Sequence, residues 1–205
     1  MEEVNAVPRF DWIGGALCLD FVNTVGSHRS LDPKERLNRF ADLVRWCADG
    51  GILQPTVSRD ILRRGSAQPG AASRLLKIAV NFRESLYRIF VAISLQRPPQ
   101  EGDLQVLNEI LAQAPMVLEV RRQNHSLSCV RTSSMLDEAK LLGPIAWSAA
   151  ELLTSEKLSS IRECASETCG WLFLDLSKNH SRRWCAMDDC GSREKAKRYY
   201  ERKKA

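Results

Sequence analysis

Cys164-Ala-Ser-Glu-Thr-Cys169 and Cys185-Ala-Met-Asp-Asp-Cys190 decide how the C-terminal part of this chain folds. Each segment holds two cysteines with four residues between them, and fifteen residues separate the two pairs. Two such pairs can aim four sulfurs at one centre, and four thiolates complete the tetrahedral shell of a structural zinc ion. The spacing therefore predicts one structural Zn²⁺, bound by Cys164, Cys169, Cys185 and Cys190, with no open position for a substrate.

The cysteines also allow other interpretations. Four thiols without a metal are one, but paired spacing on both sides of a turn is typical of metal sites in a reducing compartment. His180 lies between the pairs, yet four cysteines already fill the shell, so we expect a histidine on a surface turn. Cys18, Cys47 and Cys129 stand in apolar or helical contexts, where cysteine usually behaves as a small buried hydrophobe.

The segment between the cysteine pairs has the pattern of a small β-structure. Residues 171–176 form an apolar run that is typical of a strand. Residues 177–180 are expected to form a polar turn, and residues 181–185 to return as a second strand. So small a unit cannot bury a large core. We therefore expect metal binding to supply much of its folding free energy, on the order of 10 kcal/mol.

The N-terminal part contains a typical signal for the start of a helix. Asp32-Pro33-Lys34-Glu35 has a capping residue, a proline at the first helical position and a glutamate three residues beyond the cap. The sequence therefore predicts a helix that begins there and ends at Gly50-Gly51. Apolar spacing predicts further helices over residues 57–64, 71–95, 103–114 and 135–153, the last bent at Gly143-Pro144.

One segment departs from the helical pattern, and with it the fold class becomes α+β. Residues 116–132 contain two apolar runs on either side of the polar turn at 123–126, which predicts a β-hairpin. A polar stretch at 154–160 then precedes the cysteine cluster. We predict a mostly helical N-terminal domain with this hairpin, residues 1–157, and a small four-cysteine zinc finger, residues 158–205.

Composition limits the class of protein. The chain has 205 residues and a net charge of +5, and residues 164–205 carry ten Lys or Arg against six Asp or Glu. The excess positive charge therefore belongs mainly to the finger.

The first residues do not resemble a signal peptide, and no apolar run approaches the roughly 20 residues of a membrane span. We expect a cytoplasmic protein. We find neither a Gly-rich phosphate loop nor a nucleophile elbow, so nothing in the sequence indicates an enzyme.

Two motifs resemble known bacterial families. Cys185 to Cys190 followed by Gly191-Ser192-Arg193, together with the first cysteine pair and 170–175, resembles the CGNR zinc finger, although Ser192 replaces the asparagine of that signature. Residues 16–24, Ala-Leu-Cys-Leu-Asp-Phe-Val-Asn-Thr, are similar to the first motif of the ABATE domain, and residues 82–86 fit its central helix. The resemblance implies a treble-clef-like finger and a role in regulating transcription under stress.

A strongly basic segment follows the last cysteine. Residues 191–204 contain seven Lys or Arg and two Glu, and helical spacing would let them lie along a phosphate backbone. The alternative is a solvated helix whose cations interact favourably with its own C-terminal dipole. We predict nucleic-acid contacts, with double-stranded DNA as the expected partner. The residues chosen are Arg182, Arg183, Arg193, Lys195, Lys197, Arg198 and Arg202.

The N-terminal motif offers a candidate pocket for a small-molecule effector. Asp20 and Asn23 fall on one face of a helix beside apolar residues, and Arg83 is a candidate partner for Asp20. The same residues suit helix caps and a buried hydrogen-bond network, which is the interpretation we favour. His28 and His125 have no evident catalytic partner in the sequence, so we expect both at the surface.

Three functions are compatible with this sequence. The first is a zinc-dependent DNA-binding regulator whose N-terminal domain senses a ligand or forms a homodimer. The second is a protein-interaction module that presents the finger as a rigid knob to an acidic partner. The third is a ligand-binding N-terminal domain with a purely structural finger. The basic helix favours the first.

Overall fold

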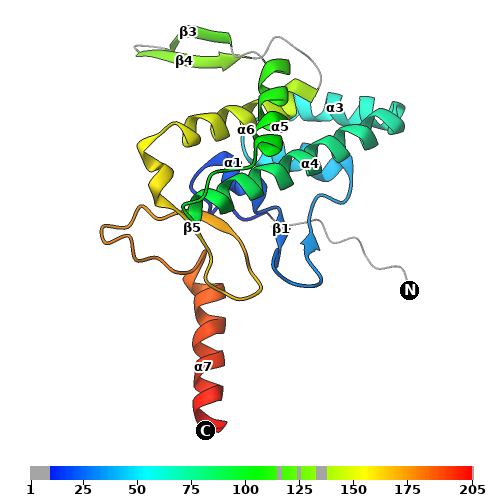
Figure 1. The fold of residues 1–205 in the computed structure, drawn as a ribbon. Coiled ribbons are helices and arrows are strands. Elements are labelled where there is room, and N and C mark those ends of the chain that lie inside the picture. The colour runs from blue at the N-terminus through cyan, green and yellow to red at the C-terminus, as the bar shows by residue number, and fades with distance from the viewer. Residues whose placement is uncertain (1–9, 115–116, 124–125, 133–137, 205) are drawn as a thin grey trace, which may run out of the picture.

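The computed structural model describes residues 10–114, 117–123, 126–132 and 138–204, and Figure 1 shows a helical body from which two projections extend. The β3–β4 hairpin lies at one end of the molecule and helix α7 at the other (Figure 1). The helices of the body are α1 Leu17–Val22, α2 Phe40–Asp49, α3 Pro55–Ala67, α4 Pro69–Ser94, α5 Glu101–Gln113 and α6 Glu138–Leu153. The described strands before the finger are β1 Val25–Gly26, β2 Lys34–Glu35, β3 Val117–Gln123 and β4 Ser126–Thr132.

Helix α4 is the central element of the body, as its sequence pattern predicts. A proline occupies its first turn, where a missing N–H costs nothing, and its apolar side chains recur every three or four residues. The helix packs against α1, α2, α3, α5 and α6. The buried apolar residues of α4 are Leu75, Ala79, Phe82, Leu86, Ile89 and Phe90.

Most predicted elements are confirmed with shifts of a few residues at their ends. The helices expected over 57–64, 71–95 and 103–114 correspond to α3, α4 and α5. The hairpin forms in a continuous antiparallel register from Val117 opposite Thr132 to Gln123 opposite Ser126. Pro144 lies within α6. The middle of the hairpin turn, His125 and the predicted start of α6 at residue 135 lie outside the described residues.

The predicted start of the first long helix is wrong. Lys34 and Glu35 form strand β2, which pairs antiparallel with β1, and α2 begins only at Phe40. The Glu35 carboxylate accepts the backbone N–H groups of Arg36 and Leu37 at 2.9 and 2.7 Å, and so it turns the chain instead of capping a helix. The cap of α2 is provided by Asp42, whose carboxylate accepts the N–H of Arg39 at 2.9 Å.

The finger follows α6 through a 3₁₀ turn, Glu156–Ser160. Strand β5, Ile161–Glu163, pairs antiparallel with β6, Leu172–Leu174, and a π-helical turn, Met187–Gly191, leads into α7, Ser192–Lys204. The strand expected over 171–176 is confirmed as β6. Its predicted partner at 181–185 is not a strand. The strand that pairs with β6 is β5. The segment with the first cysteine pair connects the two strands, so that β5 and β6 form a hairpin.

The finger shares its core with the helices. Ile161, Leu172 and Leu174 belong to the same apolar cluster as α1, α4 and α6, so β5 and β6 pack against the N-terminal body. A second, smaller cluster surrounds the four cysteines and includes Trp171 and Phe173. Within the described residues, no helix combines the length and apolar character needed to cross a bilayer.

Candidate metal centre and nucleic-acid interface

The first cysteine pair is positioned by the connection between β5 and β6. Cys164 follows β5 directly, and its N–H donates to the carbonyl of Trp171 at 2.8 Å, which extends the hairpin by one pair. Gly170 has φ of +71°, a left-handed conformation that glycine adopts without cost. A Cβ at this position would lie 3.1 Å from both His28 and Tyr87, so the chain passes close to the body here.

The second pair is positioned by the entry to α7. Cys190 lies in the π-helical turn, whose ring is closed by the N–H of Gly191 donating to the carbonyl of Ala186 at 3.0 Å. Cys185 precedes this turn, and its N–H donates to Cys164 Sγ at 3.4 Å. One pair thus comes from a hairpin connection and the other from the start of a helix, as expected for a treble-clef-like finger.

The four sulfurs have the geometry of a tetrahedral metal site. All four Sγ atoms lie within 4.8 Å of one another, and all four side chains are buried. Cys169 Sγ lies 3.7 Å from Cys185 Sγ, which lies 3.5 Å from Cys190 Sγ. A tetrahedral ion with Zn–S bonds of about 2.3 Å requires sulfurs roughly 3.8 Å apart. The residues fit one structural Zn²⁺, and Cys164, Cys169, Cys185 and Cys190 are its ligands.

Two arginines that were predicted to bind nucleic acid, Arg193 and Arg182, lie against this site. Arg193 Nη2 donates to Cys190 Sγ at 3.0 Å, and its Nε lies 3.2 Å from the Asp189 carboxylate. The contact with Cys190 raises the pKa of the Arg193 guanidinium. Arg182 donates to the carbonyls of Trp184 and Cys185. Both guanidiniums therefore place positive charge and N–H donors beside four thiolates.

Two side chains in the first half of α7 contact the connection between Cys164 and Cys169. Lys197 Nζ lies 2.8 Å from the Glu167 carboxylate, and Ser166 Oγ donates to Glu194 at 3.0 Å. Residues of the first cysteine pair's connection therefore orient the helix. Beyond this contact α7 extends away from the body (Figure 1), and its side chains from residue 195 to 203 are exposed.

The remaining predicted contact residues lie on the free side of α7 or beside it. Lys195, Arg198 and Arg202 are spaced three and four residues apart, on the side of the helix opposite Arg193. Among the described residues, Lys195 and Arg202 have no ion-pair or hydrogen-bond partner. Arg198 and Arg183 lie 5.9 and 5.1 Å from the centre of the Trp184 ring. We call Lys195, Arg198 and Arg202 the basic stripe.

His180 is not a metal ligand in this structure. Its ring is exposed, and Nδ1 lies 2.9 Å from the carbonyl of Asp175. Asp175 is a site residue that sequence reasoning missed. It is fully buried, and its carboxylate accepts the N–H groups of Ser177 and Arg182 at 3.0 and 2.9 Å. It thereby fixes the turn that leads to the second cysteine pair.

The candidate pocket residues Asp20, Asn23 and Arg83 are all buried, but each has a different partner. Asp20 accepts the N–H of Gly14 at 2.7 Å, and burial raises the pKa of its carboxyl to about 6 although Gly14 and Ile13 donate to it. Asn23 is hydrogen-bonded to the backbone of Leu172 in β6. The predicted pairing of Asp20 with Arg83 is wrong. A ligand pocket at these residues stays a prediction.

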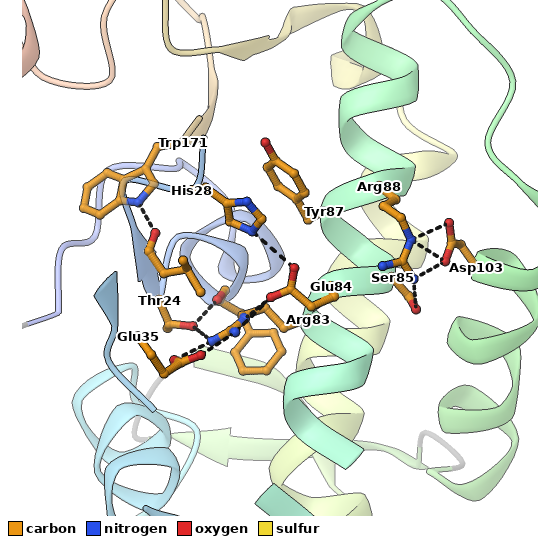
Figure 2. Close-up of polar contacts among 12 residues, drawn as sticks. Thr24, His28, Glu35, Arg83, Glu84, Ser85, Tyr87, Arg88, Asp103 and Trp171 are labelled. Atoms are coloured by element: carbon orange, nitrogen blue, oxygen red, sulfur yellow. Dashed lines mark hydrogen bonds and ion pairs between the residues drawn. The ribbon is translucent and has the colours of Figure 1, made fainter. Parts of the chain in front are cut away.

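Arg83 is instead the centre of a buried ionic network (Figure 2). Its side chain is 2% exposed and donates to the two oxygens of Glu35 at 2.7 and 2.6 Å. It also contacts Thr24 Oγ1 at 3.2 Å and the carboxylate of the adjacent Glu84. These contacts join the end of α1, strand β2 and helix α4.

The network continues through Glu84 to His28, which was wrongly predicted to lie at the surface. His28 is largely buried, its Nε2 lies 3.3 Å from the Glu84 carboxylate, and its ring stacks on Tyr87 at 3.7 Å between centres. Burial raises the pKa of Glu84, but the contact with His28 and the charge of Arg83 outweigh it and lower that pKa to about 2.

A separate groove of about 400 Å³ lies between α4 and α5. Its lining combines four apolar side chains with one lysine, one glutamate and two amides. Its lining consists of Lys77, Ile78, Asn81, Phe82, Val106, Glu109, Ile110 and Gln113. The candidate pocket residues Asp20, Asn23 and Arg83 lie outside this lining.

Comparison with protein families accounts for nearly the whole chain. Residues 15–156 match the ABATE family, described as a "putative stress-induced transcription regulator", and residues 160–203 match the CGNR zinc finger. A comparison with curated proteins finds no match. The family match covers well over half of the chain, and the cysteines identified above fall inside the matched finger. The chain therefore belongs to the ABATE family, with a zinc-binding CGNR finger at its C-terminal side.

Proposed function

We propose that this protein regulates transcription by binding double-stranded DNA through its zinc finger, and that it acts by binding and not by catalysis. The observation that supports this is the basic stripe of Lys195, Arg198 and Arg202 on the free side of α7. The zinc site fixes the start of the helix, and Glu167 and Ser166 hold its opposite face. The finger thus presents three exposed cations, of which only Arg198 has a contact within the described residues, with the Trp184 ring.

The dimensions and charge of α7 suit a duplex. Thirteen residues make a helix about 20 Å long, and the major groove of B-DNA is wide enough to admit an α-helix. The exposed Tyr199 lies next to the basic stripe, whereas the exposed Tyr200 lies on the side of α7 that carries Arg193. Arg182 and Arg193 offset the charge of the four thiolates, which leaves the basic stripe and Arg183 for phosphates.

The sensing role is a separate part of the proposal. The groove between α4 and α5 has the size of a small-molecule site, and both apolar and polar side chains line it. It is a better candidate for the effector site than Asp20, Asn23 and Arg83, because the polar atoms of those three residues have partners within the protein.

The proposal is tested with two triple variants of the full chain that remove the same charge. K195Q/R198Q/R202Q removes the basic stripe, whereas R59Q/R64Q/R74Q removes three exposed arginines of the N-terminal body. Duplex binding is measured by fluorescence anisotropy at several salt concentrations, and bound zinc is measured in parallel. The stripe variant should bind at least ten-fold more weakly, and its log–log salt slope should fall by about one per removed contact.

The control variant should retain most of the affinity, because its lost charges lie away from the finger. Equal weakening of both variants would mean that only net charge matters. Unchanged affinity of the stripe variant, with zinc retained, would rule out α7 as the contact surface and favour an acidic protein partner for the finger.

A further inference from the structure

The free edge of the finger's hairpin is closed by a residue of the N-terminal motif. Strand β6 pairs with β5 on one edge, and on the other edge Leu172 is bound by the side chain of Asn23. The Asn23 Nδ2 donates to the Leu172 carbonyl at 2.8 Å, and its Oδ1 accepts the Leu172 N–H at 2.9 Å. The amide thereby acts as one residue of a third strand.

The loop after Asn23 holds the first cysteine pair directly. The N–H of His28 donates to the carbonyl of Cys169 at 2.8 Å, and the N–H of Arg29 donates to that of Thr168 at 3.2 Å. The Trp171 Nε1 donates in turn to the carbonyl of Val25. The backbone of a zinc ligand is thus hydrogen-bonded to the N-terminal body.

Helix α4 also takes part in this joint, because its Tyr87 contacts Glu163, the last residue of β5. The Glu163 carboxylate accepts hydrogen bonds from Arg29 Nε at 2.7 Å and from the Tyr87 hydroxyl at 3.1 Å. Tyr87 also stacks on His28, whose ring lies beside the Glu84 carboxylate of the Arg83 network. The joint between finger and body therefore contains the end of α1 at Asn23, the loop after β1, and α4. Figure 2 shows how His28, Tyr87, Glu84 and Trp171 lie in it.

We propose that this joint couples zinc occupancy to the conformation of the N-terminal body, so that the body controls how tightly the finger retains its metal. The metal fixes the hairpin connection, and this fixed connection presents the Cys169, Thr168 and Leu172 groups that the body binds. When the metal leaves, those partners lose their positions, and the end of α1 and the Tyr87 side of α4 become less constrained. Linkage makes the effect reciprocal.

This inference does not depend on the nucleic-acid contact proposed above. The residues that carry it belong to the joint with the body, and none of them belongs to the basic stripe. A failure of DNA binding therefore leaves the coupling intact, and a failure of the coupling leaves the DNA proposal intact.

The first measurement is the zinc affinity of the full chain, by competition with a chelator of known affinity. Asn23→Ala should weaken Zn²⁺ binding about ten-fold, because it frees the edge of β6. Asn108→Ala, the same substitution at an exposed position of α5 outside the groove lining, should leave it unchanged. Equal zinc affinity of wild type and Asn23→Ala would overturn the proposal. If Asn23→Ala does not fold, Tyr87→Phe decides instead, since it removes one hydroxyl and should weaken zinc binding a few-fold.

The second measurement is hydrogen exchange of the wild-type chain with and without chelator. Removal of zinc should raise exchange at residues 17–29 and 83–87 as well as in the finger. An increase confined to residues 161–204 would show that the body does not respond to the metal, and would overturn the coupling.

Discussion

The role of each cation on the finger is decided by what its side chain already contacts. Arg193 and Arg202 lie on the same helix and look equivalent in the sequence, yet Arg193 donates to a zinc ligand, whereas Arg202 has no ion-pair or hydrogen-bond partner among the described residues. The four cysteines were predictable because a tetrahedral metal site demands that they meet. The contact between Arg193 and Cys190 was not predictable, because it depends on the π-helical turn that places the Cys190 sulfur beside the Arg193 side chain.

The two arginines should therefore respond differently to the same substitution. Arg193→Gln removes a charged donor from the Cys190 sulfur, so zinc affinity should fall about ten-fold, as for other groups that support metal ligands. Arg202→Gln should leave zinc affinity unchanged and weaken only nucleic-acid binding. Chelator competition and anisotropy on both variants check this division. Identical zinc affinities for the two would contradict it.

Asp20 gives a pH-dependent prediction at the same scale. Burial raises the pKa of its carboxyl from 3.8 to about 6, so the folded state retains the proton longer than the unfolded state. The protonated Asp20 carboxyl therefore makes a contribution to the free energy of unfolding that is fully present below about pH 4 and is lost as pH rises through 6. Above pH 6 the ionised group costs at most about 3 kcal/mol.

Asp20→Asn should remove this titration while keeping an oxygen for the N–H of Gly14. The difference in free energy of unfolding between variant and wild type should grow in favour of the variant from pH 4 to 6 and be constant above 7. Urea titrations at each pH measure it. Because both proteins carry the same zinc site, a difference that does not vary with pH would mean that Asp20 does not titrate in this range.

At the scale of elements, apolar spacing predicted helices well where no contact with a distant residue competed with the local signal. The apolar spacing of α4 agrees with its long buried face. The cap-like segment at Asp32 failed because Glu35 is used by a distant group, the Arg83 guanidinium, which belongs to α4. A buried charge that needs a partner outweighs a helix cap worth about 1 kcal/mol.

This competition predicts unequal effects for two acids that are three residues apart, Asp32 and Glu35. Glu35→Ala leaves the buried Arg83 short of its main partner and should destabilise the fold by about 3 kcal/mol. Asp32→Ala should cost less than about 0.5 kcal/mol, since α2 begins only at Phe40. Urea unfolding followed by circular dichroism compares them. A cost near 1 kcal/mol for Asp32→Ala would instead support a helix that begins at Asp32.

At the scale of the whole molecule, the sequence shows two units and the structure joins them. Asn23 and Leu172 are 149 positions apart, and no local pattern connects an asparagine near the N-terminus with a strand of the finger. Three apolar residues of β5 and β6 pack into the main core. They stand in apolar runs too short to indicate from the sequence which core they would join. The division into 1–157 and 158–205 remains a prediction from composition.

Separating the chain at that boundary tests how far the finger depends on the body. In the fragment 158–205, Ile161, Leu172 and Leu174 would be exposed to water, although in the whole chain they are buried. Exposing them removes hydrophobic stabilisation that zinc binding must then replace, so the fragment should bind Zn²⁺ at least ten-fold more weakly than the full chain. Adding residues 1–157 in trans should restore part of the loss, since those residues supply the missing contacts. Equal affinities of fragment and full chain would mean that the finger folds as an independent unit, and that its packing against α1 and α4 contributes nothing to metal retention.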